Sequence, residues 1–239
     1  MLKKLNIFNK ILALIVLALI GANIYYLFRY KSWDRYYFAS SVTVPKSYPI
    51  HIDEIFFKYP NDDIGASFYK STDEVNNFGS DWGHAYYFPE APHPIRLPKE
   101  LALSYFDYRA NKFYSTRIAL SPDEIKKHFT EAEKGKNFTD LYNVNGDVKG
   151  LIFLVGIANN GNIMLWLKGK NYAKLLFKKH LEPIPISKSF NYENFKTEEA
   201  YKAKFFEYLS DSIKQKINAG WEAKANYIDS TKQFKESLD

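Results

Sequence analysis

The chain has 239 residues, of which 46% are apolar and 18% aromatic, so it can form one sizeable hydrophobic core. The net charge of +6 does not indicate nucleic-acid binding: five of the 33 basic residues lie in the acid-free residues 1–31, and the other 28 nearly balance the 27 acids. The absence of cysteine excludes disulfides, thiolate chemistry, cysteine-ligated metals and a lipid-modified N-terminal cysteine.

The first predicted element is a membrane anchor. Residues 11–28 (ILALIVLALIGANIYYLF) form an apolar run just long enough to span the hydrocarbon core, and only Asn23 in it is strongly polar. Basic residues flank the run at both ends, and Tyr25, Tyr26 and Tyr30 lie near its C-terminal end, as at a membrane interface. We therefore predict a single-pass anchor in residues 1–31. A cleaved signal peptide is the alternative, and both interpretations place the rest of the chain outside the cytoplasm.

Short β-strands are predicted next. Aromatic and β-branched residues between prolines and turn-forming residues predict strands at 33–44, 50–58, 65–70 and 82–88. Residues 71–81 lack periodicity and predict a loop. Residues 101–108 and 113–120 flank a short polar stretch and predict a β-hairpin.

A helix is predicted after this hairpin, from Ser121 to about Gly135. Ser121 suits the N-cap, Pro122 the first helical position, and Glu124 the third position of a capping box.

The strongest local signal is a second hairpin. Residues 151–158 and 162–169 flank Asn159-Asn160-Gly161, which suits a tight turn with positive φ at Asn160 and Gly161. In the register expected for that turn, Val155 faces Trp166 and Ile157 faces Met164, with Leu154 and Leu165 on the opposite face from Val155 and Trp166. Both faces are apolar, so we expect central strands covered on both sides.

The C-terminal part is predicted to be helical. Residues 171–181 fit either a helix or a strand. Thr197 is expected to cap a long helix that Gly220 stops or kinks, with a second helical piece from Trp221 toward Phe234. The apolar stripe of the long helix recurs every four residues: Tyr201, Phe205, Leu209, Ile213 and Ile217.

The predicted fold class is α+β. We expect a mainly antiparallel β-sheet or sandwich domain with one inserted helix, C-terminal helices and an N-terminal transmembrane helix. Three parts are predicted: the anchor at 1–31, the β-rich domain at 32–192 and a helical extension at 193–239.

Motifs of known chemistry do not occur in the sequence. It holds no nucleophile elbow, phosphate-binding loop or dinucleotide fingerprint, so neither an enzyme nor a cofactor is predicted. His84 and His93 could meet nearby carboxylates, but their spacing fits no known metal site, so we expect solvated loop positions. Trp82 follows the predicted loop 71–81, and for it core packing is favoured over a role as an exposed binding anchor. As possible interface residues we single out Trp82, His84, His93 and Trp221.

Four motifs carry a family resemblance. They are Tyr48-Pro49-Ile50, Trp82-Gly83, a Leu-Pro-x-x-Leu-x-Leu-x-Tyr strand (97–105) followed by Lys-Phe-Tyr (112–114), and the hairpin from Val155 to Gly169 with its Leu-Trp-Leu-x-Gly strand. Over about residues 33–182 the chain resembles the bacterial family of domain of unknown function 2931. The resemblance implies a Gram-negative envelope protein, commonly a lipoprotein, and some members are suspected immunity proteins of type VI secretion. This sequence departs from that pattern because it has a membrane helix and lacks the lipoprotein cysteine.

These observations predict a binding module anchored in the inner membrane, with its C-terminal domain in the periplasm. We expect its partner to be a protein, either a secreted toxin such as a type VI lipase effector or another envelope protein. The alternatives are an envelope enzyme with an unrecognised His and carboxylate site, and a structural component of an envelope complex.

Overall fold

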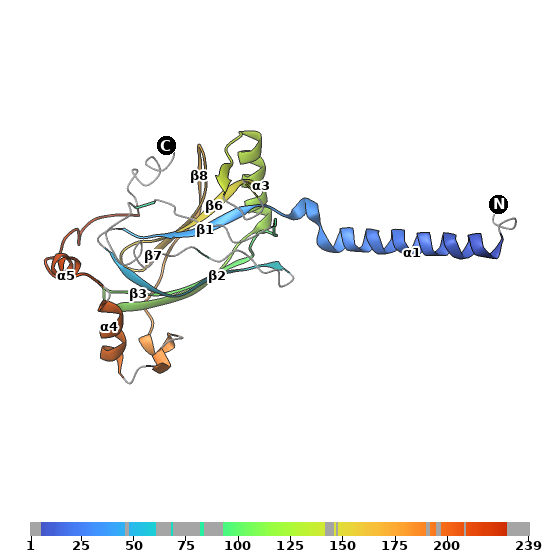
Figure 1. The fold of residues 1–239 in the computed structure, drawn as a ribbon. Helices are drawn as coiled ribbons and strands as arrows, with labels where there is room; N and C mark the ends of the chain where they lie inside the picture. Colours follow the sequence, from blue (N-terminus) through green and yellow to red (C-terminus); the bar gives the residue numbers. More distant parts are fainter. Residues whose placement is uncertain are drawn as a thin grey trace. The chain divides into compact units, whose positions relative to one another are not determined.

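A computed structural model describes most of the chain, and Figure 1 shows its fold. The described residues are 6–45, 48–60, 68, 82–83, 93–141, 146, 148–189, 192–194, 197–207 and 209–228. The chain divides into two compact units, Met1–Arg35 and Tyr36–Asp239.

The first unit is a single long helix. Helix α1 (Ile7–Tyr30) begins after Asn6, whose side chain accepts a hydrogen bond from the backbone of Asn9, and ends at Lys31 in the left-handed conformation. A short 3-10 turn, η2 (Ser32–Asp34), follows. The 24 residues of α1 rise about 36 Å, more than the roughly 30 Å of a hydrocarbon core. None of them is buried, and the apolar window has a mean hydropathy of 2.4. Length and composition therefore suit a membrane span, as predicted.

The second unit is a sandwich of two sheets (Figure 1). The five-stranded sheet has the order β1 (Phe38–Thr43), β6 (Val148–Ile157), β7 (Asn162–Gly169), β8 (Tyr172–His180), with β5 (Thr139–Leu141) also paired to β6. The three-stranded sheet has the order β2 (Ile50–Lys58), β3 (Glu100–Asp107), β4 (Lys112–Ala119). Every strand pair is antiparallel except β1 with β6. The predicted α+β class is thus confirmed.

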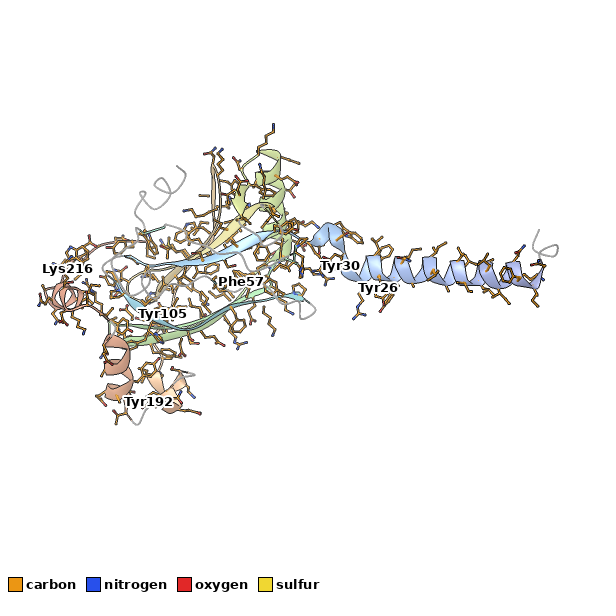
Figure 2. All side chains as sticks on the ribbon, viewed as in Figure 1. Tyr26, Tyr30, Phe57, Tyr105, Tyr192 and Lys216 are labelled. Atoms are coloured by element: carbon orange, nitrogen blue, oxygen red, sulfur yellow. The ribbon has the colours of Figure 1, made fainter. Side chains whose placement is uncertain are left out.

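Aromatic residues fill the space between the sheets. Phe57 of β2 and Phe153 of β6 lie with ring centroids 5.1 Å apart, and Phe129 of the inserted helix lies 6.3 Å from Phe153. Figure 2 shows the side chains on this fold, with Phe57 and Tyr105 labelled between the sheets. Burial of such large apolar surfaces is the main contribution to the stability of the sandwich.

Several predicted elements are confirmed. Strand β2 spans the predicted residues, the hairpin of β3 and β4 forms, and helix α3 (Pro122–Lys134) is capped by Ser121, which accepts a hydrogen bond from the backbone of Glu124. The ambiguous residues 171–181 form β8. The first strand is shorter than expected because residues 32–34 form the 3-10 turn. The strand predicted at 65–70, like most of that predicted at 82–88, lies outside the described residues.

The predicted register of the second hairpin is wrong by one residue. Asn160 and Gly161 do have positive φ, but Ile157 pairs with Ile163 and Leu154 with Trp166. The backbone N–H of Ala158 donates to the carbonyl of Asn162, so the loop between the strands has three residues, 159–161, where two were predicted. A one-residue slip moves side chains to the other face of a strand. Leu154, Met164 and Trp166 consequently cluster on the outer face of the sheet.

The single long C-terminal helix is also wrong. Two helices form, α4 (Glu198–Phe206) and α5 (Asp211–Asn218), because the side chain of Ser210 accepts from the backbone of Ile213 and starts a new helix. Thr197 caps α4 as predicted. Three stripe residues are nevertheless buried with the β3–β4 hairpin in one cluster, namely Tyr201, Leu209 and Ile213, and the partly buried Ile217 packs against it.

The chain after α5 does not continue as a helix in its described part. Gly220 has a φ of +73° and ends the helical path, as predicted. Residues 221–224 then form turns, and no helix follows up to residue 228, which corrects the predicted second helical piece over that range. The remainder of that piece lies outside the described residues.

Candidate functional sites

Two indole rings pack edge to face on the outer face of the five-stranded sheet. Trp166 projects from β7, and Trp82 packs against it with ring centroids 5.7 Å apart. Gly156 of β6 lies beneath both rings, and a Cβ atom there would be 2.8 Å from Cη2 of Trp82. The glycine of this hairpin motif therefore makes room for the tryptophan pair.

Two hydrogen bonds fix the Trp82-Gly83 dipeptide over the sheet. The backbone N–H of Gly83 donates to Oγ1 of Thr43 at 3.0 Å, and Nζ of Lys168 donates to the carbonyl of Gly83 at 2.7 Å. Burial lowers the pKa of Lys168 to about 8. The dipeptide is thus tied to β1 and β7, so the role that the structure shows for Trp82 is packing.

Residues 221–228, here called the C-terminal strap, run from α5 to this outer face. Side chains from three loops hold the strap through its backbone carbonyls: Tyr48 donates to Ala223 at 3.0 Å, Asn159 donates to Ala225 at 3.1 Å, and the guanidinium of Arg109 donates to Trp221.

The strap ends on the tryptophan pair. Tyr227 lies with its ring centroid 6.1 Å from that of Trp82 and 5.8 Å from that of Tyr48, and Ile228 joins the Trp166 cluster. The guanidinium of Arg109 lies 4.7 Å from the centroid of the Tyr48 ring. The strap therefore connects α5 and the loops of Tyr48 and Arg109 with the tryptophan pair on the outer face of the five-stranded sheet.

A buried carboxylate supports the turn beside the strap. Oδ1 of Asp107 accepts hydrogen bonds from the backbone N–H groups of Arg109 and Ala110, each at 2.9 Å. Burial raises the pKa of Asp107, and the two hydrogen bonds oppose that rise. Both bonds stay within the β3–β4 turn, so Asp107 is a structural group of that turn.

The predicted interface residues fall into three situations. Trp82 and Trp221 both belong to what we call the strap assembly, which is the strap together with the tryptophan pair and the side chains that hold the strap. The ammonium of Lys216 lies over the Trp221 ring, 4.9 Å from its centroid. His93 is exposed, two residues before the bridge of Ile95 to Tyr36. His84 lies outside the described residues. The structure therefore brings the two tryptophans, but not His93, to one assembly.

A groove that the sequence did not indicate opens between α3, β4 and β8. It has a volume of about 450 Å³, within the range of ligand pockets. Its apolar lining comes from the end of β4, one face of α3 and the middle of β8: Ile118, Leu120, Ile125, Leu175, Leu176 and Phe177. Its ionisable lining is Glu124, Lys127, His128 and Lys174, with two lysines to one carboxylate. Strands β4 and β8 are each the last described strand of their sheet.

A hydrogen-bonded cluster of titratable groups borders this groove. The hydroxyl of Tyr172 lies 3.0 Å from Nδ1 of His128 and donates to Oε2 of Glu131 at 3.2 Å, and the same Nδ1 lies 3.3 Å from Oε2. The hydrogen bonds from His128 and Tyr172 lower the pKa of Glu131. Burial, and then the bond to Glu131, raises the pKa of Tyr172 to about 12. His128 was missed because its partner Tyr172 is 44 residues away.

The described residues hold no group of three His, Asp or Glu side chains placed to bind a metal ion. The groove combines apolar walls with the side chains of Lys127 and Lys174, which suit an apolar partner with acidic groups. The groove can bind such a partner, and the imidazole of His128 can in addition accept or donate a proton.

Comparison with known proteins gives one match. The family model described as "Protein of unknown function (DUF2931)" matches residues 30–234, which include the sandwich, α4, α5 and the strap. No curated protein and no solved structure matches the chain significantly.

Proposed function

The chain belongs to the DUF2931 family, and we propose that it is a membrane-anchored binding protein of the Gram-negative envelope. In this proposal α1 spans the inner membrane and holds the unit Tyr36–Asp239 in the periplasm. The observation that carries it is that α1, a helix long and apolar enough for a membrane, has no buried residue and belongs to a unit separate from the compact domain. Such a helix finds its apolar surroundings in a bilayer.

The proposed activity is capture of a protein, and the proposed partner is a secreted toxin such as a type VI lipase effector. The domain would then act as an immunity protein that blocks the toxin at the membrane it attacks. The toxin assignment rests on the family resemblance described above, and the domain supplies a groove in which binding can occur.

The groove between α3, β4 and β8 is the proposed docking site. Partly buried apolar side chains of Leu176 and Phe177 line it, and Lys127 and Lys174 are exposed at its walls. Buried apolar contacts supply affinity, and complementary charges supply specificity and association rate. We therefore expect the partner to present apolar side chains flanked by acids.

Co-purification tests this function. The full chain, in detergent, is captured after co-expression with each product of its neighbouring genes, and cell growth is measured alongside. We expect a stoichiometric complex with a toxin-like neighbour and protection of the cells. Absence of a complex with every neighbour would contradict the proposal, and a complex with a non-toxic envelope protein would favour the structural alternative.

Charge reversal tests the docking site. The double substitution Lys127→Glu and Lys174→Glu should weaken the complex at least tenfold. Lys188→Glu with Lys224→Glu is the matched control, because both lysines are exposed and neither lines the groove. Equal binding by both double variants would move the interface away from the groove.

One observation favours a second candidate, an envelope enzyme. His128 at the groove is hydrogen-bonded to Tyr172 and Glu131, an arrangement that can orient an imidazole as a general base. The substitution His128→Gln separates the two functions. Loss of protection with an intact complex would support the enzyme, whereas full protection would remove it.

A further inference from the structure

Helix α1 carries a polar side chain that the membrane cannot satisfy. Asn23 lies inside the apolar run 11–28, five residues from its C-terminal end, which is about 7 Å along the helix axis. Its Nδ2 donates to the carbonyl of Leu19 at 2.8 Å. Its carbonyl oxygen accepts no hydrogen bond from the residues that the structure describes. In hydrocarbon no water replaces that missing donor, so a partner for Asn23 has to come from another helix.

The position of Asn23 defines a heptad seam along α1. Asn9 lies fourteen residues earlier, at the same heptad position, and is the other asparagine within the helix. With both at position a, the seam continues through Val16 and Tyr30 at a, and its d positions are Leu12, Leu19 and Tyr26. Valine at a with leucine at d favours two-stranded packing.

The aliphatic side chains of the seam are exposed along α1. Leu12, Val16 and Leu19 are each about half exposed, and Tyr26, labelled in Figure 2, is 66% exposed. Tyr26 also contacts the ring of Tyr25, and the guanidinium of Arg35 lies over the ring of Tyr30. The aliphatic part of the row, Leu12, Val16 and Leu19, is therefore available to pack against another helix of matching spacing.

We propose that α1 forms a parallel two-stranded homodimer in the membrane through this seam, with Asn23 paired to Asn23 of a second copy. Identical chains insert in the same orientation, so an in-register parallel pair sets each a position against itself. An amide carries both donor and acceptor groups, so two related copies can each donate to the other. A second copy is thus the partner whose polar group lies at the required depth.

This dimer rests on the membrane insertion proposed above and adds a consequence for binding. Two periplasmic domains would be held at one point of the membrane. A partner with two sites would then bind more tightly without any new contact, because the second binding event is intramolecular.

Cysteine cross-linking tests the seam, because the chain has no cysteine of its own. Single cysteines replace Val16 or Leu19 on the seam, or Leu14 or Leu17 off it, in the full chain in native membranes. Mild oxidation should give disulfide-linked dimers for Val16→Cys and Leu19→Cys and far fewer for the other two, because only seam positions approach within disulfide range. Equal cross-linking at all four positions, or none at any, would overturn the seam.

Substitution of Asn23 tests the polar contact. In detergent micelles Asn23→Leu should weaken dimerisation about 3-fold to 30-fold, the range expected for an interhelical amide contact, whereas Asn23→Gln should retain most of it. Unchanged dimerisation of Asn23→Leu would refute the proposed pairing. Alkaline extraction of the same membranes separates the two proposals: release of the wild-type chain refutes the anchor itself, and retention with a flat cross-linking pattern refutes only the dimer.

Discussion

The substitution Gly156→Ala tests how tightly the tryptophan pair packs on the outer face of the sheet. A Cβ atom at Gly156 would contact Cζ3 of Trp166 and lie 2.6 Å from Cη2 of Trp166 and 2.8 Å from Cη2 of Trp82. Favourable carbon–carbon contacts lie at about 3.5–4.0 Å, so at least one indole ring has to move by roughly 1 Å. Trp166 is 3% exposed and packs in a cluster with Leu154, which leaves it little room.

Overpacking of a filled site costs about 1–3 kcal/mol. We expect Gly156→Ala to lower the free energy of unfolding by about 2 kcal/mol. With a urea dependence near 2 kcal/mol per molar, the midpoint should fall by about 1 M. The assay is urea unfolding of the full chain in non-ionic micelles, followed by tryptophan fluorescence.

A control and a rescue make this prediction specific. Gly21→Ala is the matched control, because a Cβ atom at Gly21 has no neighbour within 4 Å and the residue lies in α1. Replacing Trp82 by Leu in the Gly156→Ala background should recover part of the loss, since one of the two rings is then smaller. An unchanged midpoint for Gly156→Ala, or strictly additive effects in the double variant, would refute the packing argument.

Two further predictions concern buried ionisable groups. Asp107→Asn keeps an oxygen acceptor for the N–H groups of Arg109 and Ala110 and should be nearly neutral, whereas Asp107→Leu should cost roughly 2 kcal/mol or more by urea unfolding. Because burial raises the pKa of Asp107, this group stabilises the fold less as the pH rises through its folded pKa, and Asp107→Asn should remove that dependence. The pKa of Lys168 is about 8 in the folded chain and near 10.4 in an unfolded one, so the unfolded chain binds more protons between pH 8 and 10. Stability should therefore rise across that window, by at most about 1.4 kcal/mol per pH unit, and Lys168→Met should flatten the rise; an equal slope in both chains would contradict the assignment.

The sequence correctly predicted those helices, strands and turns that are determined by residues adjacent in the chain. The N-cap of α3 depends on Ser121 and its next three residues, and the positive φ values at Asn160 and Gly161 belong to the turn itself. Strand β2 is bounded by Pro49 and Pro60, so its limits could be inferred. Apolar α1 likewise follows from its composition alone.

The register error shows where local signals end. The turn residues were identified, but the loop has three residues, 159–161, because the backbone N–H of Ala158 donates to the carbonyl of Asn162, and a backbone hydrogen bond of this kind is not specified by the side chains. That single extra residue decides whether Trp166 points into the sandwich or onto its outer face. Both faces of the hairpin are apolar, so hydrophobic alternation could not choose between them.

The sequence does indicate a helix start at Ser210, but the regular apolar stripe across this position favoured one continuous helix. Serine followed by aspartate is a typical helix start, and Ser210 performs that role for α5. A four-residue spacing continued across this position from Tyr201 to Ile217, and it suggested one helix. The stripe residues still reach a common cluster because both helices pack toward the β3–β4 hairpin.

The strap assembly could not be predicted from the sequence, for a physical reason. The three hydrogen bonds that hold the strap are accepted by backbone carbonyls, which every residue possesses. The side chains of Ala223 and Ala225 therefore give no sign of these bonds in the sequence. The donor Tyr48 is 175 residues from its acceptor. Trp221 stood out in the sequence for its ring, whereas the contact that Arg109 makes with it is to its carbonyl. In an assembly of this kind the sequence information lies in the donor side chains. Long polar side chains such as Tyr48 and Arg109, which reach across the fold, are therefore the residues from which it could be inferred.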